Sequence, residues 1–314
     1  MTTIDAPPTR ETGYETNGRH RRQDREQTAE RLLASSAKLS FDPLVDVDWD
    51  AEPVDGLWYM QPERSPLYGT ALWASLGEDQ KVELTRHQLA STAASGIFFE
   101  MILMRMLLRH LGPHDPRSQH FQYGLTEVAD ECRHSTMFGK LISWLGTPPY
   151  GPGSGVRGLS ELLTTPVSND AVAFAGTYYV EAILDAIQRE GMNDERCQPI
   201  TRKVAYIHVV EEARHMRYAD AELARDLEAL SGWDLQRTRL LLPLIPLVVN
   251  QLLMHPAGYA AAGLDVEEAK AVAAANPVWR ETLRWAARRP MGIFAELGLL
   301  AGPAMALWRR TGLV

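Results

Sequence analysis

Two Glu-x-x-His motifs, Glu131–His134 and Glu212–His215, are the part of this sequence best suited to chemistry. Residues three apart on an α-helix share a face, so the Glu and the His of each motif can address one point in space. The glutamates Glu100 and Glu181 each precede one motif by 31 residues. That spacing is enough for a helix, a turn and an antiparallel return. The same layout of carboxylates and imidazoles therefore occurs twice.

The surroundings of the two upstream glutamates favour a metal site over surface charge. Glu100 follows Ile97, Phe98 and Phe99, and Glu181 lies in an equally apolar stretch. Carboxylates in apolar surroundings are rare unless they are paired or bound to a metal. A single Glu-x-x-His is commonly a solvated pair on a helix surface, but two motifs at equal offsets from two such glutamates are hard to explain that way. The pattern predicts a buried metal site.

Four carboxylates and two imidazoles suit a pair of iron ions. Carboxylate oxygens can bridge two ions and neutralise their charge, while the histidines bind from the outer sides. Manganese or a mixed Fe/Mn pair could use similar ligands. Zinc is less favoured, because the pattern matches neither a closed structural zinc site nor a three-ligand hydrolytic one.

An acid precedes each motif glutamate, and an arginine precedes each motif histidine. We expect Asp130 and Glu211 to accept the second N–H of a metal-binding histidine on the facing helix, which would fix its tautomer. Arg133 and Arg214 would then hold these acids in place. The alternative is ordinary helix-surface charge, but the same acid-Glu-x-Arg-His order occurs in both motifs.

One histidine breaks the symmetry between the two motifs. His208 lies four residues before Glu212 and seven before His215, so all three side chains share one helical stripe. The corresponding residue before Glu131 is Glu127. A histidine on an apolar face is commonly a core residue with its hydrogen bonds satisfied, but one helical turn from a metal-binding glutamate we expect His208 to be a seventh ligand.

Helical periodicity and its stop signals predict an all-α fold, a four-helix bundle with one long crossover and additional N- and C-terminal helices. Three of the four long helices are expected at about 79–111, 118–146 and 199–232. The other is expected to begin after the capping cluster 168–170 and to end at 191, with the crossover beginning in the Pro/Gly-rich stretch 148–155. Residues 1–25 are expected to be a disordered tail. The remainder, 26–314, is expected to be a single helical domain with the metal-binding bundle at about 78–232 and a helical extension at 233–314.

Composition and the distribution of apolar residues limit the partners and the location that we expect for this protein. A net charge of −8 and a pI near 5.6 argue against nucleic acid. Two cysteines provide no disulfide framework, and the N-terminus has no apolar core of a signal peptide, so we expect a cytoplasmic protein. The apolar stretches 240–254 and 290–308 are short or interrupted by proline and glycine. We expect them to be buried or to form a homodimer rather than to cross a membrane.

The set Glu100, Glu131-x-x-His134, Glu181 and His208-x-x-x-Glu212-x-x-His215 resembles the AurF-like non-haem di-iron N-oxygenases, aminobenzoate N-oxygenase-like members of the ferritin-like superfamily. The resemblance covers roughly residues 75–230, and the additional histidine is its narrowest feature. It implies that all seven side chains bind iron. It also implies that O2 is the co-substrate, that a peroxo di-iron(III) species forms, and that an amine is oxygenated stepwise toward hydroxylamine and nitro products. A small-molecule amine and an external electron donor are the implied partners.

A substrate pocket is expected beside the metals. Gly96 leaves room, while Phe99, Leu103 and Tyr178 could supply apolar walls, and Asp185 could meet a cationic amine. The turns before Glu100 offer no arginine for an aromatic carboxylate, which counts against aminobenzoate itself. The alternatives are another di-iron oxidase or hydroxylase, a desaturase-like enzyme, or a non-catalytic iron-binding ferritin-like protein. The extra histidine favours the N-oxygenase.

Overall fold

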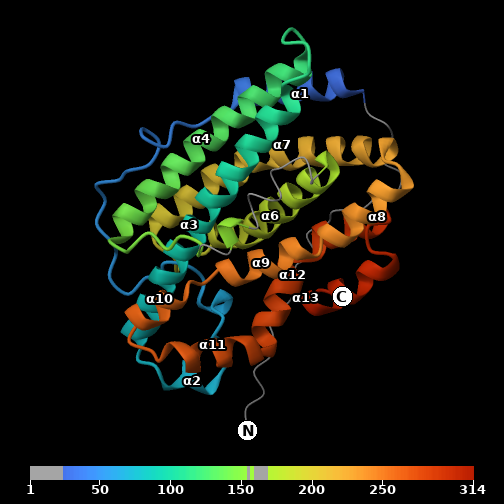
Figure 1. Cartoon of the computed structure of the whole chain (residues 1–314). Coiled ribbons are helices and arrows are strands. Elements are labelled where there is room, and N and C mark those ends of the chain that lie inside the picture. The colour runs from blue at the N-terminus through green and yellow to red at the C-terminus, as the bar shows by residue number, and fades with distance from the viewer. Residues whose placement is uncertain (1–23, 154–155, 159–168) are drawn as a thin grey trace.

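The computed structural model describes residues 24–153, 156–158 and 169–314. The disordered tail was predicted for residues 1–25, and residues 1–23 of it lie outside the described range. Only its last two residues, Asp24 and Arg25, are described. These two are ordered, because Asp24 caps the first helix through a hydrogen bond from the Gln27 amide (3.0 Å) and Arg25 begins that helix. The helical domain therefore begins slightly earlier than predicted. The described residues form helices and no sheet strands, as predicted (Figure 1).

The four long helices are α3 (Glu78–Leu111), α4 (Gln119–Leu145), α6 (Asp170–Gly191) and α7 (Pro199–Ala229), each within a few residues of its predicted bounds. Local signals set their ends. Ser118 and Asn169 cap the starts of α4 and α6 with their side-chain oxygens, and Gly146 ends α4 at a φ of 62°. Such caps satisfy amides and carbonyls that have no partner within the helix.

Contacts between helix ends establish the crossover. Arg86, near the start of α3, donates to the carbonyl of Leu145 at the end of α4 (2.8 Å), so these two helices are antiparallel. Asp170 at the start of α6 contacts His110 at the end of α3 (Oδ2 to Nδ1, 2.9 Å). The connection from α4 to α6 therefore leads from one end of the bundle to the other, as predicted.

The remaining helices cover the bundle. They are α1 (Arg25–Lys38), α2 (Ala71–Ser75), α8 (Gly232–Leu241), α9 (Leu244–Leu252), α10 (Pro256–Ala261), α11 (Val266–Ala275), α12 (Pro277–Glu296) and α13 (Met305–Thr311), with two short 3-10 turns at Pro62–Arg64 and Gly302–Ala304. Helix α1 lies against α4 and α7, while α12 packs on α6. The C-terminal extension is therefore part of the same packed body.

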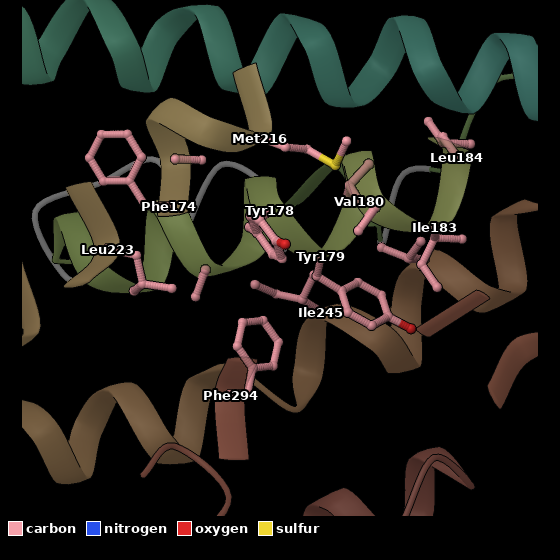
Figure 2. Close-up of a cluster of buried hydrophobic side chains, with 14 of the residues drawn as sticks. Phe174, Tyr178, Tyr179, Val180, Ile183, Leu184, Met216, Leu223, Ile245 and Phe294 are labelled. Atoms are coloured by element: carbon pink, nitrogen blue, oxygen red, sulfur yellow. The ribbon is translucent and has the colours of Figure 1, made fainter. Parts of the chain in front are cut away.

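Helix α6 is buried almost all the way round because the C-terminal extension covers the side that the bundle leaves open. Ile245 of α9 and Phe294 of α12 belong to the same buried cluster as Tyr178 and Tyr179 of α6 (Figure 2). A helix that is apolar on all sides needs such enclosure. As a result, Glu181 in the middle of α6 is only 3% exposed.

Two segments are long and apolar enough to cross a membrane by length and composition, residues 78–111 and 232–261. The first is α3, which contributes Glu100 to the interior of the bundle. The second is divided into α8, α9 and α10. The stretch 290–308 is likewise divided among α12, a 3-10 turn and α13. The absence of a membrane partner stays a prediction.

Two glycines on α4 provide a matched test of bundle packing. A Cβ at Gly124 would lie 2.6 Å from both Cδ atoms of Leu111, whereas a Cβ at Gly139 would meet nothing within 4 Å. We expect Gly139→Ala to stabilise the protein by up to about 1 kcal/mol through helix propensity. Gly124→Ala should instead destabilise it by about 1–3 kcal/mol through overpacking. Denaturant unfolding measures both, and equal shifts in the two variants would contradict this packing.

Candidate metal centre

The seven predicted ligands meet in the middle of the bundle. Each of the four long helices contributes at least one of them: Glu100 from α3, Glu131 and His134 from α4, Glu181 from α6, and His208, Glu212 and His215 from α7. All seven residues are at most 3% exposed. Their oxygen and nitrogen atoms form three overlapping groups, within each of which the atoms lie within 4.8 Å of one another.

The two Glu-x-x-His motifs face each other at the centre. His134 Nδ1 lies 3.3 Å from Glu131 Oε2 and 3.2 Å from Glu212 Oε1. His215 Nδ1 lies 3.0 Å from Glu131 Oε1 and 3.1 Å from Glu212 Oε1. Each of these glutamates thus lies between two imidazoles on different helices. Carboxylates in this arrangement are placed to bridge two cations.

His208 joins the same cluster. Its Nε2 lies 3.5 Å from Glu212 Oε1 and 3.8 Å from Glu100 Oε1. Glu100 also accepts a 2.5 Å hydrogen bond at Oε2 from Ser135 Oγ, while its Oε1 has no hydrogen-bond partner among the described residues. Buried polar atoms without partners are rare in folded proteins. The unpaired oxygen therefore fits a cation that it would bind.

Burial makes the negative charge of the cluster costly. Burial, together with the carboxylates of Glu212 and Glu131, raises the pKa of Glu181 well above its ordinary value, and burial also raises that of Glu100. Burial lowers the pKa of His134, but its contacts with Glu131 and the neighbouring glutamates outweigh this and raise it well above the ordinary value. Protons neutralise the site when no other cation is present. Divalent metal ions can take their place.

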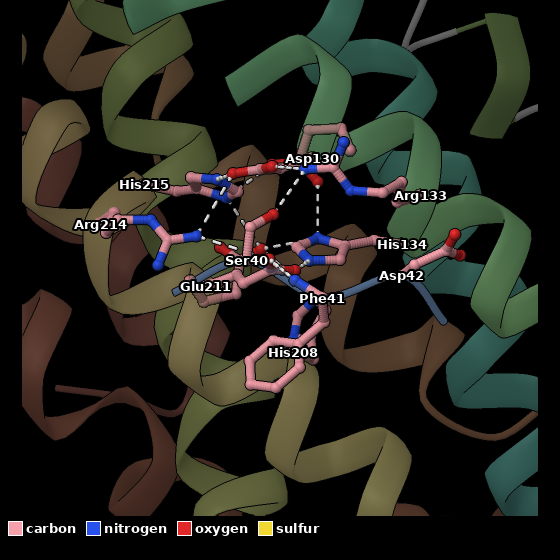
Figure 3. Close-up of polar contacts among 12 residues, drawn as sticks. Ser40, Phe41, Asp42, Asp130, Arg133, His134, His208, Glu211, Arg214 and His215 are labelled. Atoms are coloured by element: carbon pink, nitrogen blue, oxygen red, sulfur yellow. Dashed lines mark hydrogen bonds and ion pairs between the residues drawn. The ribbon is translucent and has the colours of Figure 1, made fainter. Parts of the chain in front are cut away.

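The acids beside the motifs make the hydrogen bonds expected of them (Figure 3). His134 Nε2 donates to Glu211 Oε2 on the facing helix (2.8 Å), and His215 Nε2 donates to Asp130 Oδ2 (3.2 Å). Because an ionised carboxylate only accepts hydrogen bonds, these contacts place the ring proton on Nε2. When a metal ion replaces the second proton of each ring, the lone pair of Nδ1 is the one directed into the cluster.

The two arginines hold these acids, as the sequence suggested. Arg133 pairs with Asp130 on α4. Arg214 Nη2 lies 3.5 Å from both Asp130 Oδ2 and Glu211 Oε1, so it connects the two acids. The positive charges of Arg133 and Arg214 therefore balance the negative charges of Asp130 and Glu211, which are buried.

Sequence reasoning missed the contribution of the segment after α1. The amide of Phe41 donates to Glu211 Oε1 (3.1 Å) (Figure 3). The carbonyl of Leu39 accepts from Arg214 Nη1 (3.1 Å). No motif could reveal these contacts, because they are made by backbone groups of an irregular segment. The segment closes the outer side of the metal centre.

Glu127 also lies beside the cluster, one turn before Glu131 on α4. It is 1% exposed, and burial raises its pKa well above the ordinary value. Its spacing of four residues from Glu131 places it on the same helical face, so the sequence already indicated its position beside the cluster. The two halves of the site therefore differ by Glu127 on α4 and His208 on α7.

An apolar cavity of about 680 Å³, partly open to solvent, reaches Glu181 between α3, α6 and α9. Phe99 and Leu103 line it, as predicted, and Thr177 is the other polar lining residue besides Glu181 among the residues described. Gly96 instead lines a second cavity of about 600 Å³, where a Cβ would lie 3.1 Å from a ring carbon of Phe138.

Tyr178 and Asp185 line neither of these two cavities, so their place in a substrate pocket stays a prediction. Tyr178 is fully buried on the side of α6 that meets the C-terminal extension, where the Arg289 guanidinium lies 5.6 Å from its ring centre. Asp185 follows Glu181 by one turn, but Arg189 holds its carboxylate at 2.6 Å. Helical spacing alone could not reveal either partner.

Residues 22–298 match the family described as p-aminobenzoate N-oxygenase AurF. The chain belongs to this family. The match covers most of the sequence and includes all seven clustered residues. This confirms the family that the sequence motifs predicted.

Known relatives add little beyond the family itself. Uncharacterized proteins of Mycobacterium bovis and Mycobacterium tuberculosis are 28% identical over 207 residues, which is 64% of this chain and 61% of each relative. The matched region therefore spans less than two thirds of those proteins. An R2-like ligand-binding oxidase with an aerobically reconstituted Mn/Fe cofactor aligns over 93% of this chain and 90% of its own, at 13% identity and a TM-score of 0.43. At that score the likeness adds nothing to the family assignment.

Because Glu211 accepts a hydrogen bond from His134, removing the charge of Glu211 should affect metal binding. Glu211→Gln should weaken iron binding about 10- to 100-fold, as is usual when the partner of a metal-binding histidine is lost. Glu228→Gln, on the exposed end of the same helix, is the matched control. Iron titration against a competing chelator measures the affinities. Wild-type affinity in Glu211→Gln would show that this acid does not support the metal centre.

Proposed function

We propose that the seven clustered side chains bind two iron ions and that the protein uses O2 to oxygenate the nitrogen of a small-molecule amine. The position of His208 carries the proposal, because its Nε2 lies 3.5 Å from Glu212 Oε1 inside the cluster. This third imidazole is the feature that the motif shares with the N-oxygenases. Manganese, or a mixed pair, is the alternative occupant of the same ligands.

Charge balance supports two divalent ions. Four carboxylates, those of Glu100, Glu131, Glu181 and Glu212, carry four negative charges when ionised, and two Fe(II) ions carry four positive charges. The whole site would then be neutral in surroundings where an uncompensated charge is expensive. When bound, iron would supply the redox chemistry with O2, and an external electron donor would return it to the ferrous state.

The protein's own contribution is to orient the ligands and to exclude water. Asp130 and Glu211 hold the ring proton of each motif histidine on Nε2, so the opposite nitrogen is free to bind metal. The segment 39–41 covers this side. The apolar cavity reaches Glu181, which is where an amine would approach.

The cavity favours an apolar amine over an aminobenzoate. Among the described lining residues, only Thr177 and Glu181 are polar and none is a cation. A substrate carboxylate buried there would lose its water without gaining a partner, which is costly. We infer that the substrate is an arylamine with an apolar substituent in place of the carboxylate.

An amine panel tests reaction and substrate together. Anaerobically iron-loaded, reduced protein is mixed with O2 and 4-methylaniline, 4-aminobenzoate or hexylamine, and the products are analysed by mass spectrometry. We expect 4-methylaniline to gain one oxygen, or two oxygens with loss of two hydrogens, faster than 4-aminobenzoate does. Products hydroxylated only on carbon would assign the protein to another class of di-iron oxidase, and a preference for 4-aminobenzoate would refute the inferred substrate.

Removing the third imidazole tests the metal-binding role of His208. His208→Ala should still fold, because its neighbours pack on four helices, but its optical spectrum after O2 addition should change. Its rate of amine oxygenation should fall at least about tenfold, the lower range for loss of a group that supports a metal. His255→Asn, which keeps a side-chain cap at the start of α10, is the control. An unchanged spectrum and rate in His208→Ala would disprove the role of this residue.

Adding a cation to the cavity should change its preference. Val248 of α9 lines the cavity, whereas its neighbour Leu247 does not. Val248→Arg should raise kcat/KM for 4-aminobenzoate relative to 4-methylaniline by about tenfold or more, since a charged hydrogen bond contributes about 1.5–3 kcal/mol. Leu247→Arg should leave the ratio unchanged. Equal ratios in both variants would mean that this cavity does not bind the substrate.

A further inference from the structure

Three histidines gather at one end of the bundle, away from the metal centre. His110 ends α3, His114 follows in the connection to α4, and His120 lies in the first turn of α4. One ring nitrogen of each lies within 4.8 Å of the others. Their ring centres are 4.6–5.4 Å apart. We refer to these residues as the three-histidine cluster.

Two helices show how far this cluster lies from the iron ligands. On α3, His110 follows Glu100 by ten residues, and on α7, Glu222 beside the cluster follows Glu212 by ten. At about 1.5 Å per helical residue, both intervals correspond to about 15 Å. The cluster is therefore a separate site that shares no ligand with the metal centre.

Two of the three rings present a buried nitrogen without a hydrogen-bond partner. His110 Nδ1 contacts Asp170 Oδ2 at 2.9 Å, which holds the ring proton on that side. Its Nε2 makes no hydrogen bond among the described residues and only a 3.6 Å ion pair with Glu222 Oε2, while His120 Nε2 has no hydrogen-bond partner among them. These histidines are 7% and 1% exposed. A buried histidine nitrogen that lacks a partner and faces other imidazoles is suited to bind a metal.

A carboxylate completes the donor set. Glu222 Oε2 lies 3.6 Å from His110 Nε2, and Arg25 Nη2 holds the same oxygen at 2.5 Å. The carboxylate can therefore remain ionised although it is almost fully buried. His114 is only partly buried, so one side of the cluster is accessible to an entering ion.

We propose that the three-histidine cluster binds one divalent transition-metal ion, with Zn²⁺ as the best match, through three imidazoles and either Glu222 or a water molecule. Zinc favours four-coordinate sites built from nitrogen and oxygen donors, and three histidines plus one further ligand are a common set. The bound ion would tie the end of α3 to the start of α4. Glu222 would extend this link to α7. The proposal is independent of the reaction at the iron centre.

Ion pairing alone explains only part of the arrangement. Burial lowers the pKa of His110, but its contacts with Asp170 and Glu222 outweigh this and raise the pKa to about 9, so a proton fills the position when no metal is bound. Burial lowers the pKa of His120 to about 3 and also lowers that of His114. Both rings are therefore neutral and offer lone pairs. Ion pairs with Asp170 and Glu222 would explain why His110 is buried, but they would not explain why two neutral imidazoles lie beside it.

Metal titration of iron-filled protein tests the proposal without involving the iron site. Oxidised protein with its full iron content is titrated with Zn²⁺, and bound zinc is measured after gel filtration by elemental analysis. We expect one zinc per chain in the wild type. His114→Ala and His120→Ala should each bind it at least about tenfold more weakly, whereas His255→Asn should bind it normally. Iron content should be the same in all four proteins.

Two further measurements keep the test decisive. Co²⁺ in place of zinc should give the intense visible absorption of a four-coordinate site in the wild type and in His255→Asn, but not in His114→Ala or His120→Ala. Zinc should raise the Tm of the wild type and leave that of His114→Ala unchanged, because a ligand stabilises only the state that binds it. The proposal would be overturned if the wild type bound no additional zinc, or if His114→Ala and His120→Ala both bound zinc as tightly as the wild type.

Discussion

Four glutamate carboxylates enclosed by four helices are the constraint on which the rest of this structure depends. Each is at most 3% exposed, and ionised carboxylates in such surroundings require positive charge nearby. The two motif histidines and the outer arginines supply part of it, and protons supply more when no metal is bound. Two divalent ions would satisfy the same demand with fixed geometry. Without a cation, burying these carboxylates lowers the stability of the fold.

Much of the surrounding architecture maintains this enclosure. The crossover between α4 and α6 allows all four helices to direct ligands to one point, while α9 and α12 cover the outer side of α6. The segment after α1 supplies backbone groups to Glu211 and Arg214. Helices outside the bundle therefore help to position the metal centre although they contribute none of its seven clustered side chains.

The sequence predicted those parts of the protein that depend on helical periodicity. The four long helices, the convergence of Glu100 and Glu181 on the two motifs, and the crossed contacts of Asp130 and Glu211 all follow from spacings of three, four and 31 residues. Periodicity determines which face a residue occupies but not what packs against that face. Spacing could therefore not predict that the Arg289 guanidinium of α12 lies over the Tyr178 ring, or that Arg189 pairs with Asp185. Helical spacing could not predict the three-histidine cluster, because its members come from a helix end, a connection and a helix start and therefore do not lie on one helical face.

The central claim is that these seven side chains hold two iron ions, one of them bound by His208. Anomalous diffraction at the iron absorption edge, from crystals of protein loaded with iron under anaerobic conditions, tests it most directly. We expect two peaks inside the bundle, bridged by carboxylates and with His208 Nε2 bonded to one of them. A single peak, or two peaks with His208 unbonded, would contradict it.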